Sequence, residues 1–166
     1  SLDVENATRM IRNYPIKLGL QMMTGLPGDT MEKSIETAKK IIAQKPDFVR
    51  IYPTLVLRDT ALCRLYEEGK YHPQTLDEAV ILCKELLLMF RDAGIDVIRV
   101  ALATTDEISD SGSVVAGPYH SAFRELCEGE IYYDLFCEKL NENADLCEFF
   151  VNPAEISKAV GNKRRN

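Results

Sequence analysis

The sequence lacks several features that would define a function at once. Its 166 residues contain no tryptophan, only two histidines and five cysteines. No two of the cysteines stand two or three residues apart, which excludes a zinc-binding cysteine pair and a three-cysteine loop for an iron-sulfur cluster. We therefore expect no metal site, and buried reduced thiols for most of the cysteines. The five are Cys63, Cys83, Cys127, Cys137 and Cys147.

The chain also lacks membrane and secretion signals. No apolar run approaches the roughly 20 residues of a membrane helix, and the amino end has no basic-then-apolar pattern. We expect a soluble, cytoplasmic protein without membrane contact. The formal net charge of −6 makes nucleic acid an unlikely partner. The only basic run, at residues 163–165, fits a solvated tail as well as it fits a partner site.

What the sequence does contain is enough apolar residues, 46%, to build one good core. Apolar spacing and capping residues predict helices at residues 3–13, 30–44, 60–68, 76–93, 121–142 and 153–160. Apolar runs predict strands at residues 16–23, 48–52, 95–102 and 146–151, and the segments 53–58 and 103–118 are predicted as connections. Alternating strands and helices indicate an α/β protein with a parallel sheet and flanking helices. Four strands are few for a closed barrel, so the chain is either a small open sheet or part of something larger.

The stretch from Gly19 to Glu32 is the most informative, because an apolar strand leads through a tight turn into a helix. Gly25 and Gly28 suit unusual backbone angles, and Asp29 with Glu32 is interpreted as a capping pair. Such a turn lies at the carboxyl end of a strand, where ligands bind in α/β folds. The alternative, that the glycines only build the turn, remains open.

Motifs along nearly the whole chain combine into a family pattern. In this order and spacing they resemble the radical S-adenosylmethionine (radical SAM) superfamily, in the branch with oxygen-independent coproporphyrinogen oxidases and elongator catalytic-subunit-like proteins. The segments are residues 25–30 (GLPGDT), 50–62 (RIYPTLVLRDTAL), 65–71 (LYEEGKY), 115–120 (VAGPYH) and 157–166 (SKAVGNKRRN).

The resemblance implies a fold and cofactors. In that family a Cys-x3-Cys-x2-Cys loop after the first strand of a partial barrel binds a 4Fe-4S cluster, and no such loop is present here. The chain is thus expected to be one half of a partial TIM-like (β/α) barrel, a single domain over residues 1–166 with a carboxyl-terminal α/β extension. S-adenosylmethionine and the cluster belong to the full-length protein, and neither is expected to bind this chain alone.

The resemblance also implies site residues, on the adenosine side of the S-adenosylmethionine pocket. They lie where two strands end: Gln21, Met23, Gly25, Tyr52 and Pro53. Coproporphyrinogen oxidases carry an acidic residue where Gln21 stands, although an amide can still bond a ribose hydroxyl or the adenine.

Two functions follow from these observations. The first is a carboxyl-terminal fragment of a radical SAM oxidoreductase, with an unassigned substrate and no activity alone. The second is a non-catalytic α/β module that binds a small molecule or a partner. The expected partners of the fragment are the missing amino-terminal half of the barrel and a second copy, paired through the exposed edge of the strand at residues 19–23.

Overall fold

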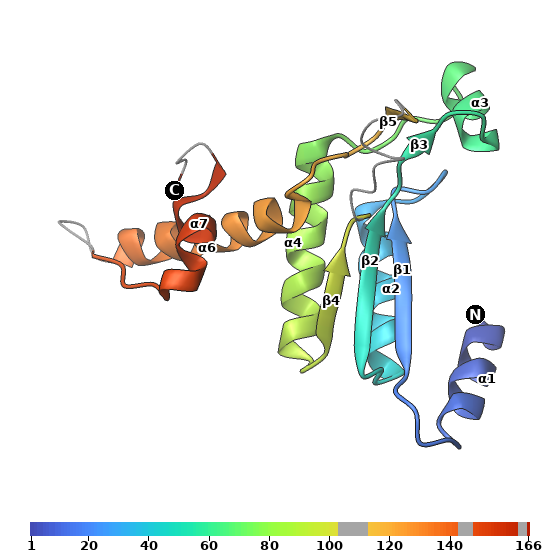
Figure 1. Ribbon diagram of the computed structural model, residues 1–166, viewed down its shortest axis with the longest axis horizontal. Coiled ribbons are helices and arrows are strands. Elements are labelled where there is room, and N and C mark those ends of the chain that lie inside the picture. The colour runs from blue at the N-terminus through green and yellow to red at the C-terminus, as the bar shows by residue number, and fades with distance from the viewer. Residues whose placement is uncertain (103–112, 143–147, 163–165) are drawn as a thin grey trace.

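The computed structural model describes residues 1–102, 113–142, 148–162 and 166. Its centre is a parallel sheet with the strand order β1 (Gly19–Thr24), β2 (Phe48–Pro53) and β4 (Asp96–Val100). All three strands run upward in Figure 1. Neighbours in the sheet follow one another along the chain, as they do in a (β/α) barrel. The prediction of an α/β fold with parallel strands is confirmed, with three such strands in the described part of the chain.

Two helices cover one face of this sheet. Helix α2 (Met31–Ala43) joins β1 to β2, and α4 (Leu76–Asp92) precedes β4 and packs against α2 (Figure 1). Thr75 and Glu78 form a capping box at the start of α4, with both reciprocal hydrogen bonds. Both helices lie behind the sheet, as on the outside of a barrel, and leave the other face uncovered. The core between them includes Met22, Ala38, Val49, Ile51, Leu82, Leu86, Phe90 and Val97.

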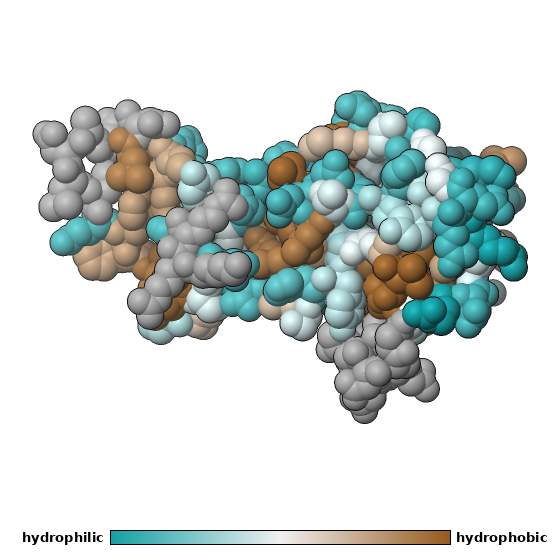
Figure 2. Space-filling view, turned by 90° about the horizontal axis from the view of Figure 1, so that it is seen from above, coloured by the Kyte–Doolittle hydropathy of each residue, from teal (hydrophilic) through white to brown (hydrophobic). Residues whose placement is uncertain are grey.

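A second, smaller layer lies above the carboxyl ends of the parallel strands. Strand β3 (Val56–Leu57) pairs antiparallel with β5 (Val114–Ala116), beside helix α3 (Ala61–Glu67). This layer has its own buried cluster of Val56, Cys63 and Tyr71. Figure 2 looks onto this end of the molecule and shows apolar patches between hydrophilic residues.

The remaining helices lie at the two ends of the molecule. Helix α1 (Leu2–Ile11) stands beside the lower end of β1 (Figure 1). After this helix, the side chain of Arg12 donates to the carbonyl of Gln44. On the other side, α6 (Phe123–Glu142) packs on α4 and on α7 (Ile156–Val160), which follows the 3-10 helix η1 (Pro153–Glu155). No helix in the described part of the chain combines the length and apolar character needed to cross a membrane.

Three predictions about local structure were wrong. The connection at residues 53–58 contains β3, and the connection at 103–118 contains β5, although residues 103–112 lie outside the described part. Of the strand predicted at 146–151, residues 148–151 form no strand, and 146–147 lie outside the described residues. The ring of Phe149 stacks on Phe136 of α6 with 4.2 Å between centroids, so this apolar run contacts a helix and not a sheet.

Candidate functional site

The turn between β1 and α2 is held together by one carboxylate. Asp29 Oδ2 accepts hydrogen bonds from the Gly25 amide (2.8 Å) and the Ser34 hydroxyl (2.7 Å), and Oδ1 accepts from the Thr30 amide (2.9 Å). The predicted capping pair of Asp29 and Glu32 is therefore wrong. Thr30 is the N-cap, since its hydroxyl accepts from Lys33, while Asp29 is turned back into the turn.

Both glycines of the turn adopt backbone angles that other residues resist. Gly25 has φ of 73° and Gly28 has φ of 77°. The Gly25 carbonyl accepts a hydrogen bond from the Tyr71 hydroxyl at 2.6 Å, and a Cβ at Gly25 would meet Gln74 Oε1 at 2.6 Å. The amide and the carbonyl of Gly25 are thus engaged within the protein, and Gln74 fills the space that a side chain here would need.

The strand register brings three of the predicted site residues together. Gln21 is paired with Arg50 and Met23 with Tyr52, and residues paired in register point to the same side of a sheet. Their neighbours Met22 and Ile51 are buried against the helices, so Gln21, Met23 and Tyr52 share the uncovered face. Met23 is 48% exposed, which is unusual for an apolar side chain inside a sheet. These three side chains form a small wall below the Gly25 turn.

Pro53 lies apart from that wall. It is buried and is paired with the buried Thr24, so its ring points to the helix-covered side of the sheet. The amide and hydroxyl of Thr54 both donate to the Thr24 carbonyl, at 2.9 and 2.6 Å, which ties the ends of the two strands together. Pro53 can shape the strand end, whereas its side chain does not face the same space as Tyr52.

Two residues beside the turn were not predicted from the sequence. Tyr71 and Gln74 line a pocket of about 180 Å³ with the turn residues 25–30, and Gln74 accepts a hydrogen bond from the Thr24 hydroxyl at 3.3 Å. Burial, followed by the negative charge of Asp29, raises the pKa of Tyr71, so its hydroxyl keeps its proton and donates. They follow the turn by more than 40 residues. Tyr71 ends the family segment at residues 65–71, but nothing in that segment indicates a contact with the turn, and Gln74 lies outside all of the family segments.

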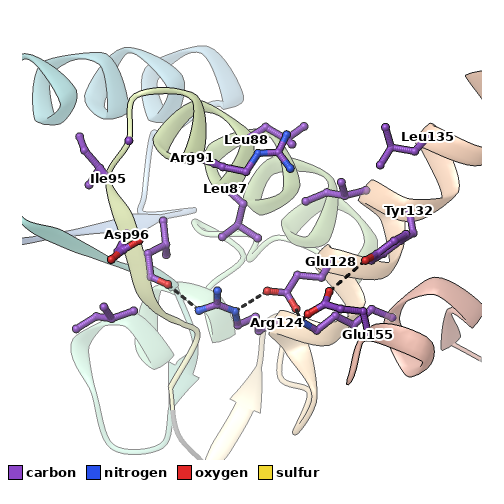
Figure 3. A pocket seen from close by; sticks show the side chains of 15 residues that line it. Leu87, Leu88, Arg91, Ile95, Asp96, Arg124, Glu128, Tyr132, Leu135 and Glu155 are labelled. Atoms are coloured by element: carbon purple, nitrogen blue, oxygen red, sulfur yellow. Dashed lines mark hydrogen bonds and ion pairs between the residues drawn. The ribbon is translucent and has the colours of Figure 1, made fainter. Parts of the chain in front are cut away.

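A larger groove, of about 710 Å³, lies along the outer edge of β4 and contains none of the predicted site residues. Figure 3 shows dashed contacts among its charged side chains at Arg124, Glu128 and Glu155, whereas no dashed line reaches Arg91. Arg124 donates to the Val97 carbonyl (2.7 Å) and to Glu128 (2.8 Å), and Lys158 bridges Glu128 and Glu155 at 2.8 and 2.9 Å. Because these charges are mutually neutralised, we interpret the cluster as the contact that fixes α6 and α7 beside the sheet.

Three cysteines are buried, and one histidine makes a local hydrogen bond at the start of a helix. Cys63, Cys83 and Cys127 are free and buried, as predicted. A hydrogen bond with the Cys83 thiol, together with burial, raises the pKa of Cys127 far above that of a free thiol. His120 accepts the amide of Ala122 ahead of α6. No group of three metal-ligating side chains occurs among residues 1–102, 113–142 and 148–162.

The parallel sheet with flanking helices is the α/β architecture expected from the family resemblance, and a family model identifies the class of protein. The family model described as the Radical_SAM C-terminal domain matches residues 46–133, more than half of the chain. This chain belongs to that family and forms an elongator-like carboxyl-terminal portion. The turn at Gly25 lies ahead of the matched residues.

Curated relatives and one solved structure agree with this family. The chain is 35% identical over 81 residues to a tRNA uridine(34) acetyltransferase of Methanocaldococcus jannaschii. This alignment covers 47% of this chain and 15% of the relative. It is 36% identical over 77 residues to Elongator complex protein 3 of Saccharomyces cerevisiae, covering 44% of this chain and 14% of that protein. The structure of Methanocaldococcus infernus Elp3 with an N-terminal deletion has a similar fold, with a TM-score of 0.61 and 24% sequence identity. The match covers 82% of this chain and 30% of the Elp3 chain. These matches span less than a third of each relative's length.

Proposed function

We propose that this chain supplies the adenosine-facing wall of the S-adenosylmethionine pocket in a radical SAM oxidoreductase and is inactive alone. The observation that carries the proposal is the shared, uncovered face of Gln21, Met23 and Tyr52 at the carboxyl ends of neighbouring strands. The ring of Tyr52 and the side chain of Met23 are paired directly, with the amide of Gln21 in the layer below. This combination suits a nucleoside, which needs stacking surface and a polar partner.

The residues present fit S-adenosylmethionine in part and do not fit the iron-sulfur cluster. Gln21 can bond a ribose hydroxyl or adenine, whereas Asp29, Tyr71 and Gln74 already occupy the amide, the carbonyl and the side-chain position of Gly25. In radical SAM enzymes the reduced 4Fe-4S cluster cleaves S-adenosylmethionine to a 5′-deoxyadenosyl radical. The described residues offer no cysteine trio to hold such a cluster, so the ligands must come from elsewhere in the protein.

A nucleoside titration tests the pocket. We expect saturation-transfer NMR to detect weak binding of 5′-deoxyadenosine to the chain, since the methionine half of the cofactor has no partner here. Gln21→Ala should remove most of the signal, and Gln44→Ala, which trims the same side chain at the end of α2, should not. Equal signals from both variants would remove Gln21 from the site.

The partners are also part of this proposal. Strand β1 is an edge of the parallel sheet and has neighbours on one side only. We propose that the missing amino-terminal half of the barrel pairs there, and that a second copy of the chain takes its place when that half is absent. Light scattering checks this assembly, and a clean monomer near 18.7 kDa would reject self-pairing. The free thiols of Cys63, Cys83 and Cys127 support a cytoplasmic location, where reduced cysteines persist.

The alternative function, a non-catalytic binding module, gains no support from the turn. An anion at residues 25–30 would need free amides, and Asp29 already accepts those of Gly25 and Thr30. A carboxylate at the centre of the turn would also repel an anionic ligand.

A further inference from the structure

The uncovered sheet face carries two arginines that the cofactor pocket does not use. Arg50 of β2 is paired in register with Arg99 of β4, and on its other side Arg50 is paired with Gln21. Both arginines are exposed, while the next pair, Ile51 and Val100, is buried against the helices. The two arginines are therefore paired on adjacent strands, whose backbones are about 4.8 Å apart, on the face that the helices leave open.

A β-bulge produces this pairing. The register shifts between Val49 and Arg50, so that Ile98 of β4 is left without a partner on β2. Without the extra residue, Ile98 would stand beside Arg50, and Arg99 would turn toward the helices. Bulges commonly re-aim a side chain near functional sites. Here the bulge places a second positive charge directly beside the first.

Neither guanidinium has a hydrogen bond or ion pair among the described residues of the chain. Asp96 lies on β4 in the layer below, beside Phe48, and makes no ion pair with Arg99. Like charges directly opposite each other destabilise a sheet. This pair of arginines is therefore suited to an anion that binds both groups at once.

We propose that Arg50 and Arg99 bind a phosphate group of the substrate. The identification of this ligand as the substrate rests on the proposed function. The two arginines lie one layer, about 6.6 Å, below Met23 and Tyr52, on the same face as the nucleoside wall. A phosphate oxyanion has enough acceptor oxygens to satisfy two planar guanidinium groups in a bidentate manner. A carboxylate of the missing barrel half is a second oxyanion that could bind the two arginines. The experiment below distinguishes a phosphate from a carboxylate.

Titration calorimetry of the whole chain at low ionic strength tests this site with pyrophosphate, uridine monophosphate and glutarate as probes. We expect saturable binding of both phosphates, and glutarate binding at least tenfold weaker. Arg50→Gln and Arg99→Gln should each weaken phosphate binding about tenfold, as expected for the loss of a charged hydrogen-bonding partner. Arg64→Gln is the matched control, because Arg64 is an exposed arginine of α3 away from this face.

Equal phosphate affinity in all four proteins would overturn the proposal. Glutarate binding as tight as pyrophosphate binding would also overturn it and assign the pair to a protein carboxylate. The arginines are exposed, so circular dichroism should show that each variant remains folded. No S-adenosylmethionine is used in this titration. Failure of the adenosine pocket would appear as lost 5′-deoxyadenosine binding with intact phosphate binding, and failure of the phosphate site as the reverse.

Discussion

Substituting alanine at Gly25 and at Gly28 in turn separates backbone strain from a specific contact. The two residues have nearly the same φ, 73° and 77°, in the same turn. A Cβ at Gly28 meets nothing within 4 Å, whereas a Cβ at Gly25 would lie 2.6 Å from Gln74 Oε1. The strain in the two variants is thus matched, and only Gly25→Ala forces a neighbour to move.

The magnitudes follow from these two differences. Holding an alanine in the left-handed region costs about 1–2 kcal/mol, which is the loss of stability expected for Gly28→Ala. In Gly25→Ala the side chain of Gln74 must also withdraw and give up its hydrogen bond from Thr24, at about 1 kcal/mol. We therefore expect Gly25→Ala to lower the free energy of unfolding by about 2–3 kcal/mol.

Urea unfolding followed by far-ultraviolet circular dichroism measures both variants, with unchanged slopes as the check that the unfolded state is the same. The double variant Gly25→Ala/Gln74→Ala completes a mutant cycle, in which the coupling between the two positions should be about 1 kcal/mol. Equal losses in the single variants, or no coupling in the cycle, would refute the role assigned to Gln74. A stability loss of this size would also require ligand-binding data for Gly25 variants to be corrected for the unfolded fraction.

Three further predictions concern the turn, the cluster at α7 and metal binding. Asp29→Ala should lower the free energy of unfolding, measured in urea, by about 2–3 kcal/mol, because three hydrogen-bond donors lose the carboxylate that accepts from them. A loss near zero would contradict this. A hydrogen bond from Lys158 lowers the pKa of Glu155 below its usual 4.5. The contribution of this Glu155–Lys158 contact to stability is therefore fully present above pH 4.5 and is lost as the pH falls through the lowered pKa. Hydrogen exchange in α7 should accelerate in acid in the wild type and depend less on pH in Glu155→Gln; identical profiles would reject the assignment. Anaerobic incubation with iron and sulfide should give no visible cluster absorption, and a stoichiometric cluster would overturn the fragment interpretation.

The helices could be predicted from local signals, and the small sheet could not. Thr60 and Thr75 are the N-caps of α3 and α4, and such caps leave a local signal because a capping hydroxyl needs only the amide three residues later. Strands β3 and β5 have two and three residues, too few to show a period, and they pair across more than 55 residues of chain. Their pairing depends on tertiary contacts that no local pattern records.

The candidate site shows the same division. Gln21, Met23 and Tyr52 were predicted through the family resemblance, and the strand register places them on one face. Whether they bind the cofactor stays a prediction. Arg50 and Arg99 could not be predicted as neighbours, because a bulge of one residue determines which side chain of β4 stands beside Arg50. A shift of one residue reverses every side chain of a strand, and the sequence contains no mark of it.

The uncovered face connects the fold to the proposed function. Parallel sheets are normally buried on both faces, yet the helices of this chain cover only one. The covered face is apolar, with Met22, Ile51 and Val100 buried, whereas the open face carries an amide, a tyrosine and two arginines beside the apolar Met23 and Phe48. A sheet face that awaited only an apolar layer would not carry unpaired charge, because burying an unpaired guanidinium is costly. The space on this side is therefore best suited to polar ligands.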